Sequence, residues 1–472
     1  MNYVFYDFET SGLNFYFDQP IQLAAKLVDQ DFNVIDEINE KCRLRDGVIP
    51  SPIAVLVTRT DLNELKKEQS FYEMMDKVHA KLSSWSPAIF IGYNNINFDE
   101  KFLRSSFYQS LHAPYLTNTN NNSRIDLYKI ILSICNLDKK YLKFPIDSKT
   151  GKKSLKLEVI AQNNSIKHEF AHDAMSDVDA TIALAKLVKE NDSLLWQHLV
   201  QFRTHQNVID YLNNNEVLYL PPTNSSGEYT PVTYLTSNPD NQKEVVLYNL
   251  SENITDEITN SRTRQIGGLF KNKIIKKVKS NDYPIFIQEE HLSEQNRDKY
   301  NLHKKEYVEK RNIIQSSTNF IMNVNQFLVD QLAEYQIDSS DYSSASDHVD
   351  ELLYSGFTGP SDWKKIDKLN NENDTNKILA ALSDFEDPRI PELYRRKLFS
   401  DKRESLPTDI LQQQKEYIKG KVFNEDTKVR WTSLSKARNE LEKAEDDERF
   451  IDMKSDFKAI RDYLNEIESD YK

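Results

Sequence analysis

The sequence predicts an α/β domain at the N-terminus, a small β-rich domain in the middle and an all-helical domain at the C-terminus. Residues 1–192 alternate short apolar strands with helical patterns. Residues 193–345 carry short β-rich runs between Pro and Gly breaks, and residues 346–472 place apolar residues at spacings of three and four. A chain of 472 residues also exceeds what one hydrophobic core usually supports.

The N-terminal domain is expected to begin with an aromatic strand, followed by a hairpin, a buried strand and two amphipathic helices. In this order, we expect strands at residues 4–8, 22–28, 32–38 and 88–91, and helices at residues 155–162 and 173–189.

The middle domain is expected to be a small barrel with a helical tail. Its predicted strands include residues 245–248, 274–278 and 284–287. A Ser- and Asp-rich stretch at 338–347 reads as a linker, and apolar residues from 450 to 467 predict an amphipathic helix.

Composition limits the class of protein. Apolar residues make up 39% and charged residues 29%, as in a folded globular protein. The formal charge of −13 argues against coating of nucleic acid by bulk attraction, although a local basic groove remains compatible with it. The distant Cys42 and Cys135 predict neither a disulfide framework nor a zinc ribbon. No apolar run is long enough to span a bilayer, so we expect a cytoplasmic protein without a membrane partner.

The first candidate chemical motif lies on the opening strand. Asp7 and Glu9 are two residues apart, so their side chains share one face of the strand. Two such carboxylates repel each other unless cations lie between them. By itself this pattern is weak, because solvated charges at a strand edge would look the same.

The second motif is residues 92–99, which follow a buried strand and end at Asp99. Asp99 could be a simple helix N-cap. However, the turn at Gly92 follows the strand directly, and α/β folds place ligand sites at such strand ends.

The third motif begins the helix predicted for residues 173–189. If Asp173 is the N-cap, His172 and Asp177 occupy the two positions that face each other in a hydrophobic staple. An imidazole and a carboxylate replace the usual apolar pair there, which favours a functional role over a structural one.

Together, Asp7, Glu9, Asp99, His172 and Asp177 resemble in order, spacing and flanking residues the active site of the DEDDh family of 3′–5′ exonucleases, which have a ribonuclease-H-like fold. Longer runs at residues 92–104, 122–127 and 172–189 are similar to the bacterial exonuclease I group. The order of an exonuclease domain, an SH3-like domain with a helical extension and a helical C-terminal domain is also that of this group. The corresponding ranges here are 1–192, 193–345 and 346–472.

The resemblance implies an exodeoxyribonuclease that degrades single-stranded DNA from the 3′ end to 5′-mononucleotides, in DNA repair and recombination. The four carboxylates would hold two Mg²⁺ ions, which Mn²⁺ can replace, and His172 would be the general base. The expected contacts to nucleic acid are Glu9, Thr10, Arg104, Tyr115, Arg124 and Lys156.

The resemblance also implies a monomer that binds single-stranded DNA and the C-terminal tail of single-stranded DNA-binding protein. Two alternatives remain. One is a DEDDh exoribonuclease that trims RNA 3′ ends, since the same chemistry serves both sugars. The other is a non-catalytic scaffold that binds single strands, which the five intact positions make the least favoured reading.

Overall fold

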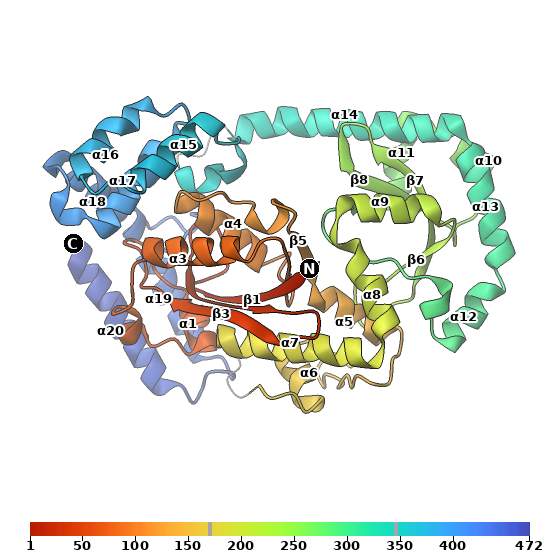
Figure 1. The fold of residues 1–472 in the computed structure, drawn as a ribbon, viewed down its shortest axis with the longest axis horizontal. Coiled ribbons are helices and arrows are strands. Elements are labelled where there is room, and N and C mark those ends of the chain that lie inside the picture. Colours follow the sequence, from red (N-terminus) through yellow and green to blue (C-terminus); the bar gives the residue numbers. More distant parts are fainter. Residues whose placement is uncertain (169–171, 344–347) are drawn as a thin grey trace.

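The computed structural model describes residues 1–168, 172–343 and 348–472 (Figure 1). A five-stranded α/β unit comes first, a four-stranded sheet with helices follows, and the long helix α14 leads to the last group of helices. The predicted boundary at 192 lies between α7 and α8, whereas the one at 345 lies outside the described residues. None of the described helices is both long enough and apolar enough to cross a membrane.

The elements of the first unit include all five strands of the large sheet. They are β1 (Asn2–Thr10), β2 (Pro20–Val28), β3 (Val34–Lys41), α1 (Pro52–Thr58), α2 (Leu62–Leu65), α3 (Phe71–Ser84), β4 (Ala88–Gly92), α4 (Asp99–Gln109), β5 (Ser123–Asp126), α5 (Leu127–Asn136), α6 (Leu157–Asn163) and α7 (Ala174–Asn191).

The remaining elements form the middle and C-terminal parts. Those of the middle part are α8 (Ser193–Val200), α9 (His205–Asn214), β6 (Leu218–Leu220), β7 (Thr230–Asn238), β8 (Asn241–Asn249), α10 (Asp256–Thr259), α11 (Thr263–Lys271), β9 (Ile275–Lys279), α12 (Glu294–Asn301), α13 (Lys304–Ser316) and α14 (Thr318–Ser343). Those of the C-terminal part are α15 (Pro360–Leu369), α16 (Thr375–Ala381), α17 (Arg389–Asp401), α18 (Thr408–Val422), α19 (Leu434–Glu445) and α20 (Lys454–Tyr471).

The large sheet has the strand order β3-β2-β1-β4-β5, and β1 at its centre pairs antiparallel with β2 and parallel with β4. Alternate residues of β1 enter different cores, because side chains alternate between the faces of a strand. Tyr3 and Phe5 pack in the core that includes α5 and α7, whereas Val4, Tyr6 and Phe8 pack in the core that includes α3 and α4. Figure 1 shows the same layers, with α7 on one side of the sheet and α3 and α4 on the other.

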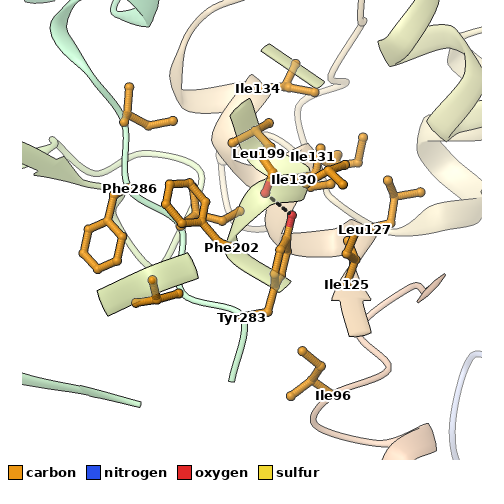
Figure 2. Close-up of a cluster of buried hydrophobic side chains, with 14 of the residues drawn as sticks. Ile96, Ile125, Leu127, Ile130, Ile131, Ile134, Leu199, Phe202, Tyr283 and Phe286 are labelled. Carbon is orange, nitrogen blue, oxygen red and sulfur yellow. Dashed lines mark hydrogen bonds between the residues drawn. The ribbon is translucent and has the colours of Figure 1, made fainter. Parts of the chain in front are cut away.

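The middle part is anchored to the first unit by a shared apolar core (Figure 2). Its own sheet is antiparallel, in the order β6-β7-β8-β9. Tyr283 and Phe286, which follow β9, lie in the same core as Ile130 and Ile131 of α5. The buried Tyr283 hydroxyl donates a hydrogen bond of 3.0 Å to the Leu199 carbonyl, so its polar end is satisfied.

The C-terminal helices turn back onto the first unit. Leu434 of α19 and Phe457 of α20 share a buried core with Val55, Leu56 and Leu62. Residues more than 370 positions apart in sequence therefore form one hydrophobic core.

Three expectations were wrong in detail. Residues 284–287 form only an isolated bridge, between Ile287 and Tyr219, because this apolar run fills the core rather than extending the sheet. Residues 338–343 continue α14 instead of forming a linker, and residues 344–347 lie outside the described part. The C-terminal stripe is helical only from Lys454, although the preceding Phe450 is also buried.

Candidate active site

Asp7 and Glu9 lie near the end of β1, where their backbones pair with Ala24 and Gln22 of β2. By alternation they occupy the face of the sheet that carries α7. Glu9 is 9% exposed, so it is nearly removed from water although it lies beside a cavity. This placement is not that of solvated charges at a strand edge.

Asp99 is the first residue of α4, and the N-cap is Phe98. The side chain of Asp99 is therefore not the cap. Its carboxylate instead accepts a hydrogen bond from the backbone amide of Phe8 on β1. The sharp turn before α4 depends on Gly92, because a Cβ there would lie 2.6 Å from the Cβ of Asn95. This turn brings Asp99 to the end of the central strand.

The start of α7 supplies the third group of residues. Asp173 is the N-cap and accepts a hydrogen bond from the Ser176 amide at 3.2 Å, as the sequence predicts. His172 precedes it with a φ of 66°, in the left-handed region, which is uncommon for a residue with a side chain. Ligand atoms of Glu9, His172 and Asp177 all lie within 4.8 Å of one another.

The like charges of these carboxylates perturb their ionisation. Burial and the neighbouring Asp99, Asp177 and Glu9 raise the pKa of Asp7 well above its ordinary value. Burial and the same kind of repulsion raise the pKa of Glu9 to about 8, and burial with nearby acids raises the pKa of Asp99 to about 8. Burial also raises the pKa of Asp177, and the hydrogen bond from His168 opposes this rise.

These observations fit a divalent cation. Hard carboxylate oxygens and an imidazole are suitable donors for such an ion. A cation would also relieve the repulsion that, together with burial, raises the pKa values of Asp7, Glu9 and Asp99. The residues that would hold it are Asp7, Glu9, Asp99 and Asp177.

Arg104 and Arg124, predicted to contact nucleic acid, are both bound to Glu100. Glu100 accepts hydrogen bonds from Arg124 at 2.8 Å and Arg104 at 3.2 Å. The side chain of Arg124 is 8% exposed and that of Arg104 is 18% exposed, so the first is largely enclosed by protein. Burial opposes the ionisation of Glu100, but the two guanidinium groups outweigh it and keep the pKa of Glu100 below its ordinary value.

The other predicted contacts to nucleic acid lie in different surroundings. The Tyr115 ring is 5.5 Å from the Arg104 guanidinium and 6.0 Å from the ring of Phe357, which is 87% exposed. Lys156 is the N-cap residue of α6 and its side chain is 71% exposed. In contrast, the buried Thr10 hydroxyl donates a hydrogen bond to the Gly12 carbonyl at 2.7 Å, so it already has a partner within the protein.

A cavity of about 860 Å³ opens beside the carboxylates. Its lining includes Glu9 and His172 of the candidate site, Arg59, and Arg449 and Phe450 from the C-terminal part. The candidate site therefore has space for a group much larger than a water molecule.

Sequence reasoning missed His168. Its Nε2 lies 2.5 Å from an Asp177 carboxylate oxygen, and its side chain is only 4% exposed. A second histidine four residues before His172 was the available signal, but nothing in the pattern connects it with Asp177.

Comparison with known proteins agrees with the resemblance. Residues 4–185 match the family model described as Exonuclease, RNase_T. The exodeoxyribonuclease I of Buchnera aphidicola subsp. Schizaphis graminum is 29% identical over 423 residues, which cover 84% of this chain and 82% of that protein.

Solved structures share the fold. Exonuclease I of E. coli in complex with a dT13 oligonucleotide has a TM-score of 0.81 at 24% identity, with 99% of both chains covered. A complex of ExoI with SSB-Ct has a TM-score of 0.79 at 23% identity, again with 99% of both chains covered. The predicted fold class and the resemblance to exodeoxyribonuclease I are confirmed.

Proposed function

We propose that this chain, whose residues 4–185 match the family model described as Exonuclease, is a metal-dependent exodeoxyribonuclease that removes nucleotides from the 3′ end of single-stranded DNA. The observation that carries this proposal is the convergence of Asp7, Glu9, Asp99 and Asp177 beside His172. Buried carboxylates that raise one another's pKa values destabilise the folded state, and a purely structural role would not compensate for this loss of stability.

We propose Mg²⁺ as the physiological ion. When bound, it supplies Lewis acidity, which lowers the pKa of a coordinated water and stabilises charge on a departing oxygen. Because the ligands must be ionised, the raised pKa values mean that binding of the ion displaces protons from the cluster.

His172 is the proposed general base. Its side chain is exposed, within reach of both Glu9 and Asp177, and it lines the large cavity where a terminal nucleotide could lie. A neutral imidazole accepts a proton readily near pH 7. The buried His168 hydrogen-bonds Asp177 and orients its carboxylate. The two histidines therefore have different roles: His168 positions Asp177, and His172 accepts the proton.

Substrate binding is proposed to use aromatic stacking and a basic edge. Tyr115 and the exposed Phe357 present adjacent rings from two segments that are far apart in the sequence. Every base has a face that can stack on such rings, whereas paired bases hide theirs, which favours single strands. Arg104 and the exposed Lys156 would contact phosphates.

We further propose that the C-terminal tail of single-stranded DNA-binding protein is a partner. The solved complex of ExoI with SSB-Ct has the same fold and supports this proposal. Fluorescence anisotropy with a labelled tail peptide would test it, and absence of saturable binding would contradict it.

The activity test presents 3′-labelled and 5′-labelled single strands, duplex DNA and RNA side by side with Mg²⁺. We expect 5′-mononucleotides released from the 3′ end of single-stranded DNA, and no activity from Asp7→Asn. Release from the 5′ end would overturn the assignment. Equal digestion of RNA would favour the exoribonuclease.

A further inference from the structure

A short loop between the 3₁₀ turn at Val349–Tyr354 and α15 carries Phe357, which is 87% exposed. Its ring lies 6.0 Å from the ring of Tyr115, which belongs to the first unit. Because so little of the Phe357 side chain packs against protein, its own contacts cannot fix the position of the ring. The backbone on both sides of Phe357 has to do so.

This loop has few hydrogen bonds of its own. Among the described residues, no backbone amide of residues 356–358 donates a hydrogen bond to another backbone group. Gly356 and Gly359 border the ring, and glycine loses more conformational freedom on ordering than any other residue. An anchor from outside the loop is therefore needed to hold one conformation.

Arg389, the first residue of α17, supplies this anchor before Phe357. Its guanidinium donates hydrogen bonds to the backbone carbonyl of Leu352 at 2.8 Å and to that of Gly356 at 3.0 Å. The side chain of Arg389 is only 7% exposed, so these bonds lie largely out of water. They fix the chain up to the residue that precedes the exposed ring.

Asp387 extends the anchor to the other side of the ring. Its carboxylate accepts hydrogen bonds from the Arg389 guanidinium at 2.6 and 2.8 Å, and one of 2.7 Å from the hydroxyl of Thr358, the residue directly after Phe357. The ion pair neutralises Arg389. The arginine therefore holds the loop and is not a free cation for a phosphate.

The same anchor connects the loop to the first unit. The Arg389 guanidinium lies 5.6 Å from the centre of the Tyr108 ring on α4, and the Tyr108 hydroxyl donates a hydrogen bond of 2.9 Å to the Val349 carbonyl. Tyr115 follows α4 in the chain. These contacts therefore set the ring of Phe357 relative to that of Tyr115.

We infer, on the basis of the proposed function, that Arg389 is a positioning residue for single-stranded DNA: it holds the loop so that Phe357 and Tyr115 can stack on a base of the strand. Among the described residues, Arg389 has no hydrogen bond or ion pair with the four carboxylates of the candidate active site. Its replacement should therefore change the binding of the strand and not the chemical step.

The test measures the affinity of the full chain for a labelled dT oligonucleotide by fluorescence anisotropy in EDTA, which prevents metal-dependent hydrolysis. Phe357→Ala should weaken binding by about 5-fold to about 150-fold, the range for loss of one stacked base. Arg389→Lys keeps a positive charge beside Asp387 but replaces the planar fork with a single nitrogen. It should weaken binding at least about threefold, because the loop loses hydrogen bonds that hold it.

A double-mutant cycle separates positioning from general destabilisation. In the Phe357→Ala background, Arg389→Lys should change the affinity by less than about 1.5-fold, because the ring through which Arg389 acts is gone. With Mg²⁺ and saturating DNA, the rate of nucleotide release by Arg389→Lys should stay within about twofold of the wild-type rate, while KM rises. Arg395→Lys is the matched control on the same helix, since Arg395 is 35% exposed and lies 3.7 Å from Glu392. It should bind DNA as the wild type does.

The outcomes distinguish this role from the proposed function. If Phe357→Ala weakens binding but Arg389→Lys binds as the wild type does, the positioning role is overturned and the proposed function stands. An equal loss from Arg389→Lys with and without the Phe357 ring would also overturn it. If Phe357→Ala itself binds normally, both the positioning role and the stacking of bases on this ring are wrong, whereas release of nucleotides from the 3′ end is measured independently.

A second variant covers the case in which Arg389→Lys does not fold. Thr358→Val removes the hydroxyl that binds Asp387 and keeps the shape of the side chain. It should weaken DNA binding at least about twofold alone and should have no further effect in the Phe357→Ala background. Wild-type affinity of Thr358→Val would then overturn the positioning role.

Discussion

Replacement of Glu100 by Gln should destabilise the first unit strongly, because Glu100 is the shared partner of two largely buried arginines. Its side chain is 1% exposed. It accepts hydrogen bonds from Arg124 at 2.8 Å, Arg104 at 3.2 Å, the Tyr6 hydroxyl at 2.7 Å and the Thr117 hydroxyl at 2.9 Å. The amide of Gln keeps the volume but removes the negative charge.

The magnitude follows from the charge left behind. Removing one partner of a buried ion pair typically costs about 3–5 kcal/mol, because the other charge stays buried without compensation. Arg124 is the more enclosed of the two arginines, so it dominates this cost. For a domain of roughly 200 residues, each kcal/mol shifts the midpoint by about 2–4 °C, so we expect a decrease of about 6–20 °C.

The measurement is differential scanning calorimetry of the full chain, following the transition that contains the first unit. Glu190→Gln is the control, because Glu190 is 64% exposed and pairs with Lys186 only at 3.9 Å. Its midpoint should change by less than about 2 °C. If the thermal midpoint of Glu100→Gln equals that of the control, the two buried arginines do not need the negative charge of Glu100.

Three further outcomes are expected. Asp7→Asn or Asp177→Asn should abolish Mg²⁺-dependent hydrolysis. The affinity for single-stranded DNA, measured by fluorescence anisotropy, should stay within about threefold of the wild-type value. Turnover at the wild-type rate would refute the metal site. The pKa values of Glu9 and Asp99 rise from 4.5 and 3.8 to about 8, so the folded state holds protons that the unfolded state has released. Stability in EDTA should therefore decrease as pH rises between about 4 and 8, and Mg²⁺ should reduce this loss; a flat profile in EDTA contradicts it. His168→Asn should weaken Mg²⁺ binding, measured by calorimetry, by about 10–100-fold, because His168 hydrogen-bonds Asp177. Activity should recover in part at high Mg²⁺ concentration. An unchanged Mg²⁺ affinity would show that His168 does not position Asp177.

The candidate active site was predictable because each part depends on a local rule. Two carboxylates on one strand must share a face, and an aspartate N-cap fixes where His172 and Asp177 lie. The surroundings of the two arginines were not predictable in this way. Glu100 and Arg124 are 24 residues apart, and only tertiary packing brings them together.

The fold was predictable to a similar degree. The strand around residues 4–8 and the helix from Asp173 follow clear periodicity and capping signals, and the structure has β1 and α7 there. The apolar run at 284–287 gave the same signal as a buried strand, because periodicity cannot distinguish a strand from a loop that fills a core. Tyr283, with a φ of 52°, breaks the extended conformation immediately before this run.

The shared core also decides whether the chemistry can be separated from the later domains. Eight residues of the first unit are buried against the C-terminal helices: Ile21, Ile49, Val55, Leu56, Leu62, Leu65, Tyr108 and Leu111. Exposure of each side chain costs about 1.5–3 kcal/mol if it is fully released to water. The sum, about 12–24 kcal/mol, is as large as or larger than the usual stability of a whole domain, about 5–15 kcal/mol. A fragment ending at residue 192 should therefore aggregate rather than cleave short oligonucleotides, as gel filtration of the purified fragment would show. A monodisperse, active fragment would mean that the first unit repacks these side chains by itself and does not need the C-terminal helices to fold.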